Sequence, residues 1–384
     1  MDSFVYIVLN ILLLFIFYQV GKRVKDCTSN YYHLSLPIII MFVLVQGSRY
    51  NRGNDYMHYV EIYKYDLEEN QILFTFINNV FKTIGIDGFS FYYIYALIFI
   101  VCAIIFLKQY RKYGRYVFPF FLISILMFHE YMIRQALGTS FIFLFLVALS
   151  KINFEDTKIN VNLVRTNIMS IVICIVSGLM AYSIHYANLI FVVMAVIGFL
   201  FYRRAISPII SIPGVILGNY VLQYSFEYSL LSVPLQMLAS ANDKMAAYAG
   251  NADNWFSSSG FNSIYVRNPL VLVLEVWGCS SLFYFGKKAL DNFDPSPLSY
   301  TLYNLFVVGY VFQGIFRQLE LLNRMCFAIS RFWFVPLAIV LYYRSYVVNK
   351  WYEKLLFVGM IFWFYEYAKF IIYRREPTLF LWDI

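Results

Sequence analysis

Apolar runs long enough to cross a lipid bilayer recur along the whole chain and constrain its fold more than any other feature. Hydrophobic residues make up 61% of the 384 residues and charged residues only 14%, a balance that a water-soluble core of this size does not require. Most runs are bounded by Lys, Arg, Asn or Gly, as expected where a helix leaves about 30 Å of hydrocarbon. The chain is therefore predicted to be an all-α, polytopic integral membrane protein.

The apolar runs predict about twelve transmembrane helices, within a range of about 10 to 14. A single transmembrane domain is expected to fill residues 1–384. The first run lacks a basic start and a small-residue cleavage site, so it is interpreted as a retained span and not as a signal peptide. The expected spans cover residues 4–20, 34–47, 89–107, 116–132, 136–150, 168–184, 187–202, 206–223, 268–285, 299–316, 325–343 and 355–373.

Basic residues flank these spans unevenly. If the amino terminus lies outside, most of the 30 lysines and arginines fall on the cytoplasmic side, as the positive-inside rule requires. The net charge of +8 is explained by these helix ends. Because the basic residues form no stripe, nucleic acid is not an expected partner.

Two polar segments on the outer side are long enough to be substrate surfaces. Residues 48–89 carry an Arg- and Asp-containing motif followed by a mildly amphipathic stretch over residues 72–84. Residues 225–268 end in a tip rich in Gly, Asn and Ser, where Trp255 is a candidate for stacking on a sugar face. A lid whose aromatic residues only pack is the alternative for this second segment.

Arginines on the predicted outer side oppose the topology rule and need another reason to be there. A guanidinium group grips phosphate with a planar fork of donors and stays charged where water is scarce, so these arginines suit a lipid-linked diphosphate. Contact with lipid head groups, or pairing with Asp55, Glu61 or Glu320, is the alternative. The arginines close to expected span ends are Arg49, Arg52, Arg134, Arg267, Arg317 and Arg324.

A histidine and three glutamates also lie at or near span ends. His185 stands between two apolar runs near the outer surface, where it can exchange a proton near neutral pH or act as a hydrogen-bonded interfacial residue. Glu130, Glu275 and Glu366 are costly in a membrane unless paired or solvated. Glu130 and Arg134 are four residues apart, so an ion pair along one helix face is expected.

Several kinds of chemistry lack their sequence signatures. The chain has no Walker loop, GxSxG, GxGxxG, DxD or HExxH motif, so neither nucleotide nor metal chemistry is indicated. Its five cysteines are widely spaced, without a CxxC pair, and four of them lie inside apolar runs. They are interpreted as core residues and not as metal ligands or disulfides.

Four stretches carry recognisable motifs. The run from Arg49 to Tyr56 reads R-x-x-x-G-x-D-Y, and the later stretches are Ile133-Arg134-Gln135-Ala136-Leu137, Ser183-Ile184-His185 and Asn323-Arg324-Met325-Cys326-Phe327. Together they resemble the EpsG and Wzy-like family of bacterial polysaccharide polymerases. The late motif of that family commonly has Glu before the arginine and Tyr after it, where this chain has Asn323 and Phe327.

The resemblance implies a glycosyltransferase of GT-C-like helical architecture in the bacterial plasma membrane. It would join undecaprenyl-diphosphate-linked oligosaccharide repeat units into O-antigen, capsular polysaccharide or exopolysaccharide on the outer side, with no cofactor and no metal. Besides this substrate and the lipid bilayer, a chain-length regulator is a candidate partner. An O-antigen ligase is the alternative within the same class, and a lipid-linked oligosaccharide flippase is the alternative from a different class.

The reaction that the resemblance implies assigns roles to the motif residues. A sugar hydroxyl attacks the anomeric carbon of a second lipid-linked unit, so fixed arginines are needed to stabilise the leaving diphosphate. His185 or Asp55 is the expected base, and Arg134 and Arg324 are expected at the leaving group. The residues expected to bind diphosphate or glycan are Arg49, Arg52, Gln135, Arg317 and Trp255.

Overall fold

The computed structural model describes residues 2–27, 29–53, 55–65, 71–152, 161–223, 267–317, 320–372 and 379–381. Within these residues the chain is helical apart from one short antiparallel pairing of β1 with β2. The first half contains α1 (Asp2–Val24), α2 (Tyr31–Gly47), β1 (Arg49–Tyr50), α3 (Tyr56–Tyr65), α4 (Ile72–Thr83), α5 (Phe91–Leu107), the 3-10 helix η1 (Lys108–Tyr113), α6 (Gly114–Tyr131) and α7 (Ile133–Ser150).

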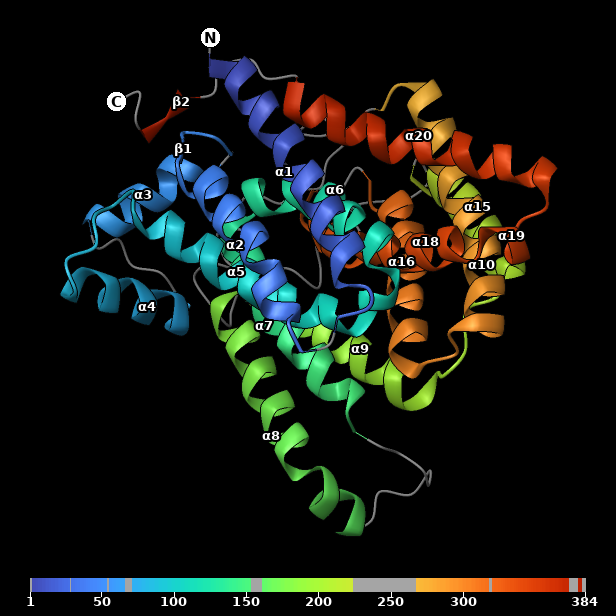
Figure 1. Cartoon of the computed structure of the whole chain (residues 1–384), viewed down its shortest axis with the longest axis horizontal. Helices are drawn as coiled ribbons and strands as arrows, with labels where there is room; N and C mark the ends of the chain where they lie inside the picture. The colour runs from blue at the N-terminus through green and yellow to red at the C-terminus, as the bar shows by residue number, and fades with distance from the viewer. Residues whose placement is uncertain are drawn as a thin grey trace.

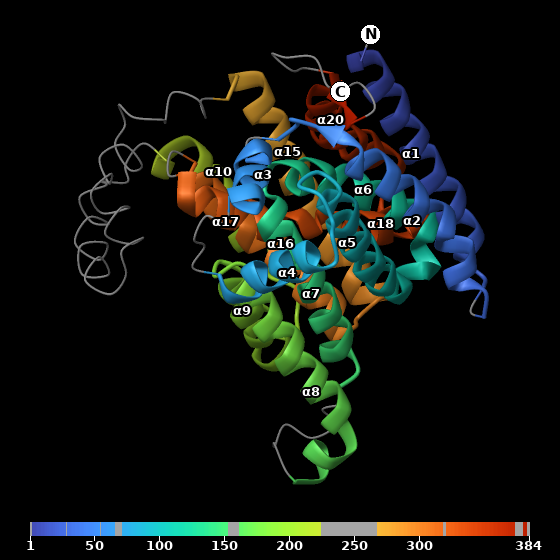
Figure 2. The ribbon, with the colours of Figure 1, turned by 90° about the vertical axis from the view of Figure 1, so that its left-hand side faces the viewer.

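The second half continues the helical arrangement (Figure 1). It contains α8 (Val161–Ile184), α9 (Asn188–Phe201), α10 (Pro208–Leu217), the π-helix η2 (Gly218–Leu222), α15 (Pro269–Phe293), α16 (Pro297–Ile315), α17 (Glu320–Ser330), the 3-10 helix η4 (Arg331–Trp333), α18 (Phe334–Tyr342), α19 (Arg344–Val347), α20 (Lys350–Ile372) and β2 (Leu379–Phe380). In both views the lower part of α8 projects beyond the other helices (Figure 2).

Three helices in this half begin at a capping residue followed by proline. The side chains of Ser207, Asn268 and Ser296 accept a backbone N–H from the first turn of α10, α15 and α16. Proline follows at the first helical position, where its missing N–H costs nothing. The dipeptides Ser-Pro and Asn-Pro therefore set these helix starts locally.

The structure confirms an all-α polytopic membrane protein. Seven stretches are long and apolar enough to cross a membrane by length and composition, and one of them, Phe91–Tyr131, contains both α5 and α6. Three shorter apolar helices, Tyr31–Gly47, Asn188–Leu200 and Pro208–Leu222, add to these. Together with α16, each of the twelve expected spans thus coincides with a helix or a helix pair among the described residues.

Glycines allow some of these helices to approach each other closely. A Cβ atom on Gly21 of α1 would lie 2.2 Å from the carbonyl oxygen of Gly114 in α6, and one on Gly278 of α15 would lie 2.6 Å from that of Gly359 in α20. Real Cβ atoms do not tolerate such distances. Small residues at helix crossings let backbones approach, which is a common way to pack helices in membranes.

Contacts between distant segments gather at two ends of the helical assembly. At one end, Arg52 donates to the carbonyl of Phe370, β1 pairs with β2, and Arg267 meets Glu366; we call this the Glu130 end. The other end joins η1, the linker before α10, the α15–α16 turn and α19 through Lys112–Tyr343, Tyr110–Ser299 and Arg204–Asn304 contacts; we call this the Tyr343 end. Segments that the sequence assigns to one side of the membrane therefore contact one another.

The predicted amphipathic stretch over residues 72–84 forms α4 at the Glu130 end. One face of α4 buries Phe74, Asn78 and Phe81. The opposite face exposes Ile72, Phe76 and Val80 at helical spacing. An apolar face left open on a short helix outside the spans suits a position at the membrane surface.

Candidate functional site

Glu130 is the centre of a buried polar cluster at the end of α6. Its carboxylate accepts a hydrogen bond from Arg52 Nε at 2.7 Å and from the Tyr6 hydroxyl, and Arg49 Nη1 lies 3.9 Å away. Arg49 and Arg52 are only 1% and 3% exposed. Burial alone lowers the pKa of Arg52, but the nearby Tyr6 and Glu130 oxygens raise it above its usual value, so this guanidinium stays charged.

Other N–H groups of the two arginines donate to backbone carbonyls of the surrounding segments. Arg49 donates to the carbonyls of Gln46 and Arg52, at 2.9 and 3.0 Å, and Arg52 donates to the carbonyl of Phe370 at 2.8 Å. Arg52 also stacks over the Tyr6 ring, with its guanidinium carbon 3.7 Å from the ring centroid. Both arginines are therefore buried and hold backbone carbonyls together, and neither lies on an accessible surface.

Gly53, the glycine of the first motif, fits against α6 because it has no side chain. Its φ is +112°, and a Cβ atom there would lie 2.2 Å from the Glu130 carbonyl oxygen. Both the backbone conformation and the close approach exclude other residues. The motif thus fixes residues 49–53 against the last turn of α6.

The expected helical ion pair between Glu130 and Arg134 is wrong. Met132 has φ −125° and ψ 54° and belongs to neither helix, so α6 ends at Tyr131 and α7 begins at Ile133. The two side chains therefore do not share a continuous helix face, and Glu130 is bound by Arg52 and Tyr6. The carboxylate and the later arginine belong to different helices that meet at this break.

Arg134 and Gln135 stand in the first turn of α7. Gln135 is buried, while Arg134 is half-buried and lies over the rings of Tyr59 and Phe74, at 5.5 and 5.6 Å from their centroids. The residue before this helix, Met132, contributes no side-chain cap. The start of α7 therefore combines an arginine with the positive end of a helix dipole.

Three of the four sequence motifs share one apolar cluster beside this helix start. It joins Tyr56, Tyr59 and Tyr63 of α3 with Phe74 and Phe81 of α4, Ile133 and Leu137 of α7, and Ile184 of α8. Tyr56 stacks on Tyr92, with their ring centroids 4.2 Å apart. Packing thus brings the first, second and third motifs together although they are far apart in the sequence.

His185 follows Ile184 in the tight turn between α8 and α9, as expected, and is half-buried. The backbone N–H of Ala187 donates to His185 Nδ1 at 3.3 Å. In the neutral ring this contact leaves the proton on Nε2.

The other predicted site residues occupy different positions. Asp55 is half-buried at the start of α3, where its carbonyl accepts the Tyr59 N–H at 3.0 Å. Arg324 is half-buried on α17, a helix that reaches α6 through Phe327 and Phe128, with centroids 6.4 Å apart. Trp255 and residues 224–266 lie outside the described residues.

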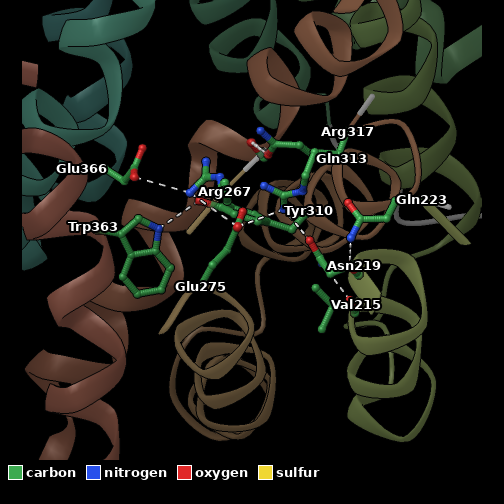
Figure 3. A network of polar contacts seen from close by, with 11 residues as sticks. Val215, Asn219, Gln223, Arg267, Glu275, Tyr310, Gln313, Arg317, Trp363 and Glu366 are labelled. Carbon is green, nitrogen blue, oxygen red and sulfur yellow. Dashed lines mark hydrogen bonds and ion pairs between the residues drawn. The ribbon is translucent and has the colours of Figure 1, made fainter. Parts of the chain in front are cut away.

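Arg317 belongs to a second buried network, centred on Glu275 (Figure 3). Its Nη2 lies 2.9 Å from Glu275 Oε2 and also donates to the side-chain oxygen of Asn219 in the π-helix η2. Arg267 lies 3.4 Å from both Glu275 and Glu366. Two arginines, from the segments before α15 and after α16, thus balance two glutamates of α15 and α20.

A small cavity of about 20 Å³ adjoins the Glu275 network. Tyr310, Gln313, Trp363 and Arg331 contribute to its lining, and the Trp363 indole donates to the Tyr310 hydroxyl at 3.0 Å. The space is enough for one water molecule among several polar groups. Arg331 brings a third guanidinium to this region, held by the carbonyls of Phe327 and Ser124.

Comparison with known proteins identifies the family. The model of the EpsG family matches residues 31–380, nearly the whole chain. The chain belongs to the EpsG family. Neither the curated proteins nor the solved structures contain a match to it.

Membership in the EpsG family supports a polysaccharide-polymerase type of function and a glycosyltransferase-like enzyme. The match spans all four motifs, from Arg49 to Arg324. It also spans Glu130 and Glu275, the carboxylates around which the buried arginines gather. The two carboxylates and the arginines around them therefore lie within the matched residues, whereas Tyr6 precedes the match.

Several residues of the two clusters were not singled out from the sequence. Tyr6, Asn219, Tyr310 and Trp363 lie in apolar runs where nothing marks them as members of a polar network. The signal that could find the clusters was the presence of Glu130 and Glu275 inside spans, because a buried carboxylate requires a partner. That signal predicts a partner but does not say which arginine supplies it.

Proposed function

We propose that the chain polymerises undecaprenyl-diphosphate-linked oligosaccharide repeat units on the outer side of the bacterial plasma membrane, with its working site at the Glu130 end. The observation that carries this proposal is the joint packing of three motifs around the start of α7 in a chain of the EpsG family. The excess of basic residues at the Tyr343 end supports the orientation, since positive charge favours the cytoplasm.

The leaving diphosphate is proposed to lie at the start of α7. Arg134 and the first-turn N–H groups of α7 supply positive charge there, and Arg324 on α17 is proposed as a second donor. A fixed donor of this kind stabilises charge that develops in the transition state without having to reorganise. Arg49, Arg52 and Gly53 act indirectly in this scheme, because they hold the end of α6 and hence the break from which α7 starts.

The acceptor hydroxyl must lose a proton as it attacks the anomeric carbon. His185 and Asp55 are the two candidate bases, and the Nδ1 atom of His185 already accepts the Ala187 N–H. We therefore propose that His185 donates a hydrogen bond to the substrate and that Asp55 takes the proton. His185→Asn, which keeps a donor, should then retain more activity than His185→Ala, whereas Asp55→Asn should lose most of it.

The test is polymerisation by purified chain in liposomes supplied with a defined lipid-linked repeat unit. A ladder of multiples on a gel is expected, and Arg134→Ala should slow its formation by about 100-fold or more, as loss of one preorganised donor does. Arg344→Gln is the matched control, because Arg344 is an exposed arginine at the Tyr343 end, 3.8 Å from Glu353, and should leave the rate unchanged.

Three outcomes would contradict the proposal. Transfer of a single glycan to a different lipid or protein acceptor would identify a ligase. Movement of the substrate across the bilayer without a new glycosidic bond would identify a transporter. Equal loss of activity in Arg134→Ala and Arg344→Gln would remove the diphosphate site from the start of α7.

A further inference from the structure

A hollow of about 810 Å³ lies between α10 and α15, at the Tyr343 end. Its volume falls in the range of about 300–1,000 Å³ that is usual for small-molecule sites. Lys287 lies twelve residues after Glu275 on α15, about 18 Å along a helix that rises about 1.5 Å per residue. The hollow is therefore separate from the Glu275 network.

One part of the hollow is apolar and faces outward. Ile209, Ile212 and Pro213 of α10 line it together with Tyr284 of α15. Ile209 is 84% exposed and Tyr284 is 54% exposed. On two helices that are apolar enough to lie in a membrane, such a surface suits contact with acyl chains.

The other part of the hollow is basic. Lys287 lies 2.5 Å from Asp291, whose other oxygen accepts the Tyr300 hydroxyl at 3.0 Å. Lys288 donates to the Val347 carbonyl at 2.8 Å, and an ammonium group has three N–H donors. The lysines exceed the carboxylate by one charge, and Lys288 keeps two donors for an anion.

We infer that this hollow binds a phospholipid with an anionic headgroup from the cytoplasmic leaflet. The acyl chains lie along the α10 wall, and the phosphate meets Lys288 and Lys287 at the membrane boundary. Basic pockets between transmembrane helices on the cytoplasmic side are suited to such headgroups. The leaflet rests on the proposed orientation, whereas the binding itself does not depend on polymerase activity.

Native mass spectrometry of the purified full chain tests this inference, with phosphatidylglycerol and phosphatidylcholine as competing probes. Phosphatidylglycerol is expected to stay bound at the higher collision energy. Lys288→Gln, which keeps a donor for Val347, should weaken phosphatidylglycerol binding about fivefold, equivalent to about 1 kcal/mol per basic residue. Lys287→Gln should act in the same direction, and Ile209→Trp should reduce binding by filling the apolar part.

Arg344→Gln is the matched control, since it removes one positive charge from the same end at a residue that does not line the hollow. It should leave lipid binding unchanged. Equal binding of the two lipids, or equal weakening by Arg344→Gln and Lys288→Gln, would overturn the inference. Unchanged melting temperatures in lipid-free detergent show that the variants remain folded, so a loss of binding in them reports on the hollow.

Discussion

Glu130 lies fully buried at the end of α6 with two guanidinium groups and a phenol around it. An ionised carboxylate in such a place costs several kcal/mol unless its partners fit well. Arg52 meets this need with a 2.7 Å contact, and its other donors reach the carbonyl of Phe370. The cluster thus joins α1, α6, α20 and the β1 segment, so its residues hold the elements of the Glu130 end together.

Gly53→Ala tests how strictly this cluster positions the first motif. The new Cβ would lie 2.2 Å from the Glu130 carbonyl oxygen at a φ of +112°. We therefore expect the free energy of unfolding to fall by more than the roughly 1–3 kcal/mol that backbone strain alone costs. The apparent melting temperature in detergent is the measurement. Gly85→Ala is the control, because Gly85 has φ +79° but nothing within 4 Å. Equal losses in the two variants would contradict the close fit.

The sequence predicted that Arg49 and Arg52 follow the second span, as they do in the structure, but it did not predict what they contact. Arg49 and Arg52 were expected at the substrate, because outward arginines oppose the topology rule. Their partner, Glu130, is separated from Arg52 by 78 positions, and no local pattern reports a contact over that range. The same holds for Arg317 and Glu275. A carboxylate inside a span predicts that it has a partner, but not which residue that partner is.

At the scale of helices, each expected span coincides with a helix or helix pair. Hydrophobic length is a strong signal, because every span must cover the same hydrocarbon thickness. The expected spans 116–132 and 136–150 placed a boundary here, but the sequence did not show that the backbone at Met132 puts Glu130 and Arg134 on different helices. The π-helix η2 was not predicted either, because it depends on how Gly218 and Asn219 pack against α16.

Gly278→Ala tests the crossing of α15 and α20. Its Cβ would lie 2.6 Å from the Gly359 carbonyl oxygen, so overpacking should cost about 1–3 kcal/mol, more than the gain of about 1 kcal/mol in helix propensity. Gly178→Ala is the matched control, since the nearest atom there is 3.6 Å away, and it should be neutral or stabilising. Thermal unfolding in detergent measures both. A Gly278→Ala variant as stable as Gly178→Ala would mean that α15 and α20 can move apart without loss of stability.

At the scale of the whole molecule, the two ends of the helical assembly differ in charge chemistry. At the Glu130 end, Arg52 and Arg317 are buried against glutamates. At the Tyr343 end, Lys112 contacts the Tyr343 hydroxyl and Lys288 the Val347 carbonyl, while Lys287 and Arg344 pair with partly exposed carboxylates. The ion pairs of the Glu130 end hold helices together. The basic residues of the Tyr343 end resemble the cytoplasmic boundary that the positive-inside rule describes.

This asymmetry predicts the orientation, which cysteine labelling can measure. Four of the five free cysteines are buried and Cys27 is half-buried, so a Cys27→Ser chain provides a quiet background. Ile84→Cys and Tyr346→Cys then place a thiol at exposed positions, 66% and 74% accessible, near opposite ends. A membrane-impermeant maleimide should label Ile84→Cys in intact spheroplasts and Tyr346→Cys only after permeabilisation. The reverse pattern would place the Glu130 end in the cytoplasm, where polymerisation on the outer side would have no site.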